Sequence, residues 1–186
     1  MSDNPSSILI TREVDRLALF TAIVGGLTVL LTYVCVFAGE DGSYFKSRFW
    51  LNIPVPTTRA ICYGLQIPAG VGYLVFLSYA TGLVGTGAAT KGILHYWDRK
   101  GLTMTIALFS LASVMWPIFT KLHFDEGWGP GWPVASLITA AVAAIIMTAG
   151  AFEADLQWPA ILGVLVFSSV VVMADGVGWN AKLLHR

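Results

Sequence analysis

Long apolar runs separated by short polar stretches organise this chain. A helix needs about 20 apolar residues to cross the hydrocarbon core of a bilayer, which is about 30 Å thick. Windows of that length with almost no Lys, Arg, Asp or Glu occur at about 17–39, 60–88, 102–120, 133–152 and 159–177. The pattern predicts an all-α integral membrane protein, a multi-pass bundle of five transmembrane helices that forms a single membrane domain over 1–186, with no soluble domain.

The residues at the edges and inside these windows refine the prediction. Asp15 and Arg16 precede the first window in a polar segment typical of a capped helix start. That window is too long for a secretory signal and no small-x-small cleavage site follows, so we expect it to remain in the mature protein. Prolines open the fourth and fifth windows, where a helix has no hydrogen bond to lose. Three threonines of the first window, at positions 21, 28 and 32, form one stripe, and we expect them to bond to their own backbone or to a neighbouring helix.

Glycines are frequent in the second window. In membrane bundles small residues let helix backbones approach closely. We therefore expect the glycines at 70, 72, 82, 85 and 87 to mark helix contacts.

Composition supports the membrane assignment. Apolar residues make up 56% of the 186 positions and charged residues 12%, with 11 basic and 11 acidic side chains and a mean hydropathy of +0.71. Soluble domains carry about 25% charged residues. A soluble enzyme is therefore excluded, and the zero net charge argues against nucleic acid as a partner. Basic residues are divided almost evenly between the two predicted faces, so they do not set the orientation.

Few residues in the predicted spans carry chemistry. No lysine lies inside a span, the three histidines lie outside, and there is no phosphate-binding loop or metalloprotease motif. We expect no cofactor and no metal. Asp175 is the deepest acid, and it is either hydrated at the interface or a proton acceptor or ligand anchor. Glu153 and Asp155 share the short fourth loop, where they are either solvated or close enough to share a proton or a cation.

Aromatic residues gather at the predicted span ends. All seven tryptophans lie within a few residues of an end, where an amphipathic ring suits the headgroup layer. With five spans, the first loop, the third loop and the C-terminal end emerge on one face. The aromatic residues there form either an ordinary interfacial belt or a pocket for an apolar, planar ligand.

The layout and two short motifs resemble the translocator protein family, also called TspO or tryptophan-rich sensory proteins. The motif in the second span is Gly72, Tyr73, Leu74, Val75 and Phe76, and the motif that closes the third span is Trp116, Pro117, Ile118 and Phe119. The chain departs from the family in the first loop, where Pro54 and Pro56 have no tryptophan directly before them, and it lacks the family's Leu-Asn pairs.

The resemblance implies binding or transport of an apolar small molecule, such as a sterol or a porphyrin, and a possible homodimer. The residues that it implies for ligand binding are Trp50, Tyr63, Gln66, Tyr73, Trp116 and Phe119. Gln66 would supply a polar contact and the others stacking, with no catalyst among them.

Two other functions fit the sequence. The chain would also serve as a structural accessory subunit of a larger membrane complex, since it has no soluble domain and almost no charge inside its spans. A membrane-embedded isomerase, cyclase or oxygenase would need at least two of the acids Glu153, Asp155 and Asp175 to face one pocket. Whether the protein is an enzyme stays open, with a binding protein favoured.

Overall fold

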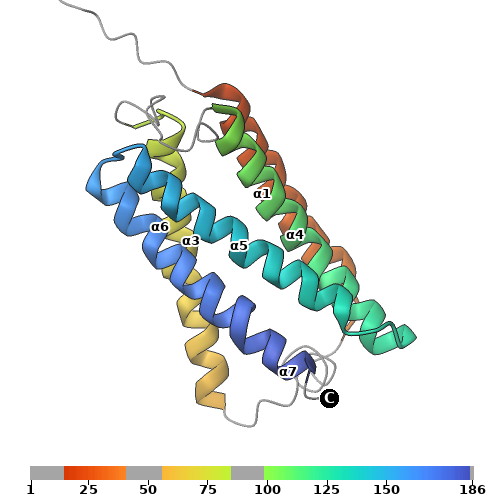
Figure 1. Cartoon of the computed structure of the whole chain (residues 1–186). Helices are drawn as coiled ribbons and strands as arrows, with labels where there is room; N and C mark the ends of the chain where they lie inside the picture. The colour runs from red at the N-terminus through yellow and green to blue at the C-terminus, as the bar shows by residue number, and fades with distance from the viewer. Residues whose placement is uncertain (1–14, 41–55, 85–98, 185–186) are drawn as a thin grey trace, which may run out of the picture.

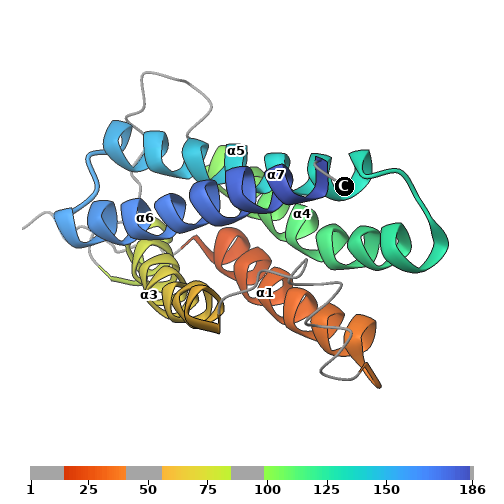
Figure 2. The same cartoon turned by 90° about the horizontal axis from the view of Figure 1, so that it is seen from below.

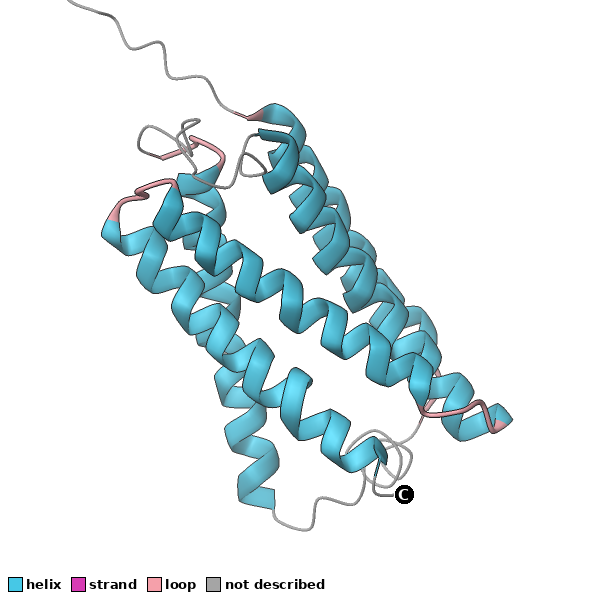
Figure 3. Ribbon diagram, viewed as in Figure 1, coloured by secondary structure: helices cyan, strands magenta, loops and turns pink. Residues whose placement is uncertain are grey.

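The computed structural model describes residues 15–40, 56–84 and 99–184. All regular structure in these ranges is helical (Figure 3), which confirms the all-α prediction for this part of the chain. The elements are α1 (Arg16–Phe37), α3 (Pro56–Ala80), α4 (Arg99–Glu126), α5 (Gly131–Glu153), α6 (Trp158–Val170), the π-helix η2 (Val171–Trp179) and α7 (Asn180–Leu184).

Within the described ranges, four helical segments are long and apolar enough to cross a membrane: Arg16–Phe37, Lys100–Glu126, Gly131–Glu153 and Trp158–Trp179. The described apolar part of α3, Gly64–Ala80, is shorter. The architecture is therefore that of an all-α membrane protein, and the count of five spans stays a prediction. α3 ends at Ala80, well before the expected 88, and α4 extends beyond the expected 102–120 at both ends.

The helices form two layers (Figures 1 and 2). α5 packs against both α4 and α6, and α1 and α3 cover this layer on one side, α1 on α4 and α3 on α6. The start of α1, the end of α3 and the α5–α6 turn lie at one end of the bundle, which we call the α5–α6 end. The end of α1, the α4–α5 turn and α7 lie at the other, the α4–α5 end.

The predicted cap forms at the start of α1. The Ala18 backbone N–H donates to Asp15 Oδ1 at 3.0 Å, which satisfies one of the amides that a helix start leaves without a partner. The Asp15 backbone N–H donates to the Thr81 carbonyl oxygen at 2.8 Å. Asp15 thus caps the start of α1 and connects it by a hydrogen bond to Thr81, which follows α3.

Small residues dominate the main core, where alanines from α1, α3, α4, α5 and α6 surround Phe76, Ile106 and Met147. Gly72 of α3 and Gly163 of α6 are both buried, and a Cβ on either would lie within 2.6 Å of the other's carbonyl oxygen. The prediction for Gly72 is confirmed. It is wrong for Gly70, where a Cβ would meet nothing within 4 Å, and Gly82 lies in a turn with a φ of 76°. The glycines at 85 and 87 lie outside the described residues.

An aromatic trio lies within the main core. The rings of Tyr73, Phe109 and Phe167 come from α3, α4 and α6, and their centroids are 4.7 to 5.7 Å apart. Such distances are typical of favourable ring pairs. The trio therefore links helices of both layers.

Most described hydroxyls in the helices bond to the carbonyl one turn earlier. Thr21, Thr28 and Thr32 donate to the carbonyls of Leu17, Val24 and Thr28 at 2.7 to 2.8 Å, which confirms the expectation that they bond to their own helix. Ser168 of α6 differs, because its Oγ donates to the Ala144 carbonyl of α5 at 2.8 Å and lies 2.7 Å from Thr148 Oγ1.

Replacing Ser168 with alanine is expected to lower the free energy of unfolding in detergent micelles by about 0.6 to 1.7 kcal/mol, the range for hydrogen bonds between membrane helices. The matched control is Ser169→Ala, because Ser169 is exposed one position further along and its change should be close to zero. Equal losses for both variants in an equilibrium unfolding titration would show that the bond between α5 and α6 contributes nothing.

Candidate functional site

Asp175 lies in the nine-residue π-helix η2, which continues α6. π-helical turns are rare and occur frequently at functional sites. The wider turn frees backbone groups, and the Asn180 side chain satisfies one of them, since its Nδ2 donates to the Gly176 carbonyl at 3.0 Å. The π-helix thus places an acid and an amide at the end of a membrane-length helix.

A second hydrophobic cluster surrounds this segment at the α4–α5 end. Trp116, Leu137 and Leu183 are buried in it, and Tyr33, Phe124, Val134 and Trp179 pack against them. The Trp116 ring centroid lies 6.0 Å from that of Tyr33 and 5.8 Å from that of Trp179. Trp116 therefore lies between an aromatic ring of α1 and one of η2.

Asp175 faces this cluster. It lies between Val171 and Trp179, each four positions away. Val171 belongs to the main core, and Trp179 packs against the second cluster. Asp175 is half-buried and is close enough to Tyr33 to interact with it electrostatically. A carboxylate inside a membrane span is costly and marks a functional site by default.

Asn180 Oδ1 and Thr120 Oγ1 are buried polar atoms at this place that have no hydrogen-bond partner. Asn180 is 6% exposed and Thr120 is 4% exposed. Thr120 lies between Trp116 and Phe124 on one face of α4, and both of these contact the second cluster. Buried polar atoms are nearly always paired, so each exception needs an explanation. We call this group the tryptophan site, and its members are Tyr33, Trp116, Thr120, Asp175, Trp179 and Asn180.

The structure separates the residues predicted for ligand binding. Trp50 lies outside the described residues, and Tyr63 lies in α3 with its side chain outside them. Gln66 is exposed on α3. Tyr73 belongs to the aromatic trio of the main core, whereas Trp116 belongs to the tryptophan site.

Phe119 lies in α4, about two turns before the helix ends at Glu126. The centroid of its ring lies 6.5 Å from that of Trp128, with the two rings stacked, and 5.6 Å from that of Trp132. Both tryptophans are exposed. These three rings have the position of an interfacial belt.

The other two candidate acids lie at the opposite end of the bundle. Glu153 ends α5, and Asp155 follows in the α5–α6 turn with a φ of 49°. All of α6 and part of η2 separate them from Asp175. The structure therefore does not bring Asp175 together with Glu153 or Asp155.

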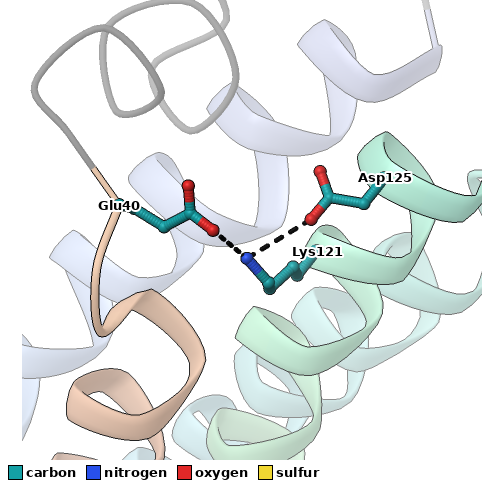
Figure 4. Close-up of polar contacts among 3 residues, drawn as sticks. All are labelled: Glu40, Lys121 and Asp125. Carbon is teal, nitrogen blue, oxygen red and sulfur yellow. Dashed lines mark hydrogen bonds and ion pairs between the residues drawn. The ribbon is translucent and has the colours of Figure 1, made fainter.

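An ion-pair network ties α1 to α4 near the tryptophan site (Figure 4). Lys121 of α4 contacts Glu40, which follows α1, and lies 3.3 Å from Asp125 one turn along. The three side chains are a quarter to a third exposed, and exposed pairs contribute at most about 1 kcal/mol. We interpret the network as a partly exposed contact that links α4 to the end of α1, not as a binding site. The described residues contain no group of His, Cys, Asp and Glu able to hold a metal ion.

A shallow groove of about 470 Å³ lies between α5 and α6–η2. Its walls include Ile145, Phe152, Leu165 and Met173. The volume is within the range of small-molecule sites, roughly 300–1,000 Å³. None of the tryptophan-site residues lines it.

Sequence reasoning singled out Trp116 and Asp175 but missed Tyr33, Thr120, Trp179 and Asn180 as members of one site. Trp179 and Asn180 follow Asp175 closely, which was a usable signal. The sequence holds no such signal for Thr120, because its distinguishing property is a missing hydrogen-bond partner, which is visible only in the packed structure.

The comparisons with known proteins add no relative. No family model matches the chain, and neither the curated proteins nor the solved structures contain a significant match. The resemblance to the translocator protein family stays a hypothesis that rests on the motifs quoted above.

Proposed function

We propose that this protein is a multi-pass integral membrane protein that binds an apolar small molecule at the tryptophan site. The observation that carries the proposal is the pair of buried, unpartnered polar atoms, Asn180 Oδ1 and Thr120 Oγ1, beside Trp116 and Trp179. Binding sites for small molecules combine apolar and aromatic walls with a few placed polar groups.

Each member of the site has a role that follows from its position. The rings of Tyr33, Trp116 and Trp179 supply apolar contact area from α1, α4 and η2. Asp175, Asn180 and Thr120 supply polar contacts that fix the orientation of the ligand. Tyr33, Asp175 and Trp179 are only partly buried, so part of each of these side chains reaches the surface of the described helices.

A thermal-shift screen of the purified protein in detergent tests the proposal, with a porphyrin, a sterol, a retinoid and a quinone as probes. A ligand present at 100 times its Kd stabilises the folded state by about 2.7 kcal/mol. We expect at least one probe class to stabilise the protein and the effect to fall in Trp116→Phe and Trp179→Phe, which remove ring contact area.

The matched control is Trp158→Phe, because Trp158 is 72% exposed at the α5–α6 end. This variant should keep the full ligand-induced shift. The unfolding temperature without ligand shows that each variant is folded. No shift of the folded wild-type protein with any of the four classes, or an equal loss in all three variants, would contradict the proposal.

A second function, that of an accessory subunit in a larger membrane complex, is favoured by α1. Only Ala18, Ala22 and Phe37 of this helix are buried, and large apolar side chains are exposed along its length, among them Leu17, Phe20, Leu27, Leu30 and Val34. A chain that is unfolded when purified alone and folded with a co-purified membrane protein would favour this function. An enzyme using paired acids has no comparable support, since Asp175 lies far from the other two.

A further inference from the structure

The groove between α5 and α6–η2 opens to the outside of the described helices. Its walls include Ile145, Phe152 and Met173, and each of these side chains is more than half exposed. Both sides of the groove belong to helical segments of membrane length. Ser169 lies halfway along the 22-residue segment Trp158–Trp179. The groove therefore faces the hydrocarbon core of a bilayer, where no water is available as a hydrogen-bond partner.

Hydroxyl groups lie in the middle of this apolar groove. Thr148, Ser168 and Ser169 all line it. On α5 the lining runs from Ile145 to Phe152, a length of about 10 Å along the helix, and Thr148 lies between these two ends. Thr148 Oγ1 and Ser168 Oγ are 2.7 Å apart, so the two helices place their hydroxyls at the same level. One cavity thus combines a central polar spot with apolar walls on either side.

The Ser169 hydroxyl is a donor without an acceptor. Ser113 of α4 and Ser136 of α5 donate to the carbonyl four positions earlier, at 2.8 and 3.1 Å, which is a common arrangement for serine in membrane helices. Ser169 is exposed, and it makes no hydrogen bond to any residue that the structure describes. An unpaired hydroxyl in hydrocarbon costs free energy. Ser169 is therefore available to donate to a molecule in the groove.

The Thr148 hydroxyl offers the opposite property. Thr148 Oγ1 and Ser168 Oγ lie 3.0 and 2.8 Å from the Ala144 carbonyl oxygen, besides their contact with each other. A hydroxyl has one hydrogen and two acceptor lone pairs. In each arrangement of these contacts both hydrogens are used within the network, and Thr148 Oγ1 keeps at least one lone pair. Thr148 can therefore accept a hydrogen bond from a molecule in the groove but cannot donate one.

These two properties select the polar group of a ligand. The group must accept from Ser169 and donate to Thr148, and a hydroxyl does both. An ether or a carbonyl only accepts, and a hydrocarbon does neither. None of the described residues that line the groove is charged, so a charged group would be left without a partner in hydrocarbon.

We propose that the groove between α5 and α6–η2 binds an apolar molecule that carries a hydroxyl group, which accepts a hydrogen bond from Ser169 and donates one to Thr148 Oγ1. The volume of about 470 Å³ accommodates an apolar body of small-molecule size. This site is separate from the tryptophan site, whose residues do not line the groove, and the inference does not depend on the proposed function.

Three probes that share one apolar body test the inference. The alcohol 1-pyrenemethanol donates and accepts, the ether 1-(methoxymethyl)pyrene only accepts, and the hydrocarbon 1-methylpyrene does neither. The protein is reconstituted in nanodiscs of phosphatidylcholine, a lipid without O–H groups. Binding is measured by energy transfer from tryptophan to pyrene, with empty nanodiscs to correct for partitioning. Since each hydrogen bond contributes about fivefold in affinity, the alcohol should bind the wild-type protein about fivefold more tightly than the ether, and the ether more tightly than the hydrocarbon.

Variants assign the two hydrogen bonds to their residues. Ser169→Ala should weaken the binding of the alcohol and the ether about fivefold and leave the hydrocarbon unchanged. Thr148→Val keeps the shape of the side chain and should bring the alcohol down to the affinity of the ether. The matched control is Ser113→Ala, which removes a hydroxyl from α4 outside the groove and should leave all three affinities unchanged.

Two further variants locate the bound probe. Ala149 is exposed and lines the groove, so Ala149→Leu adds bulk there and should weaken the binding of all three probes. Trp179→Phe changes the tryptophan site and should leave the preference for the alcohol unchanged.

Several results would overturn the inference. Equal affinities of the alcohol and the ether for the wild-type protein would show that the groove accepts no hydrogen bond from its ligand. A preference for the alcohol that neither Ser169→Ala nor Thr148→Val reduces would place the hydroxyl at another site. Absence of binding, or binding that Ala149→Leu does not weaken, would show that lipid chains or another helix cover the groove.

Discussion

Replacing Gly163 with alanine is expected to lower the free energy of unfolding by about 3 kcal/mol, the upper part of the range for overpacked interiors. The added Cβ would lie 2.6 Å from the Gly72 carbonyl oxygen and 3.3 Å from the Val75 Cβ. A backbone oxygen cannot rotate away as the end of a flexible side chain can. The helices α3 and α6 would have to separate, which loosens the packing along their whole contact.

The control for this variant lies on the same helix pair. Gly70→Ala on α3 adds the same methyl group where nothing lies within 4 Å. Alanine favours helix over glycine by about 1 kcal/mol, so this variant should be as stable as the wild type or more stable. Circular dichroism during thermal unfolding in detergent measures both. Equal stability of the two variants would show that the α3–α6 crossing is looser than the backbone positions indicate.

Replacing Phe167 with alanine is expected to lower the free energy of unfolding by a similar amount, about 3 kcal/mol. This value is the lower end of the range for buried Phe to Ala changes in soluble proteins, because lipid tails are as apolar as the core and the gain from leaving water is absent. The cost comes from the cavity and from the loss of two ring contacts, 4.7 Å to Tyr73 and 5.1 Å to Phe109.

The matched control is Phe152→Ala. Phe152 is 54% exposed whereas Phe167 is 5% exposed, so the control loses the same atoms from a surface position and should change the stability by less than about 0.5 kcal/mol. An equilibrium unfolding titration in mixed micelles measures both variants. Similar losses at the two positions would mean that the aromatic trio does not hold α3, α4 and α6 together.

Both predictions concern the helix that positions Asp175. The crossing at Gly163 and the ring of Phe167 fix α6 against α3 and α4, and η2 continues directly from α6. The face that carries Val171, Asp175 and Trp179 is oriented by this packing. Changes in α6 that leave the protein folded are therefore expected to act on the tryptophan site as well.

The helical class of the protein and much of its local detail follow from the order of residues along the chain. Charge-free runs of membrane length predict helices because a backbone in lipid must satisfy its own hydrogen bonds. The cap at Asp15 and the hydroxyl bond of Thr21 follow from rules that act within one helix or one turn. The glycine at Gly72 permits the close contact that the structure shows with Gly163 of α6. The error at Gly70 shows the limit of these rules, because a small residue permits a helix contact but does not say which face of the helix has a neighbour.

Which residues form the site depends on how the helices pack against one another. Tyr73 and Trp116 both belong to the quoted motifs, yet the packing of α3 on α6 and of α1 on α4 assigns them to different clusters. Tyr33 meets Trp116 and Trp179 through contacts between residues far apart in the chain, and the missing partners of Thr120 and Asn180 exist only where the helices enclose them. Pairings between helices depend on the relative rotation and crossing of whole elements, which the order of apolar and polar residues along one chain does not specify.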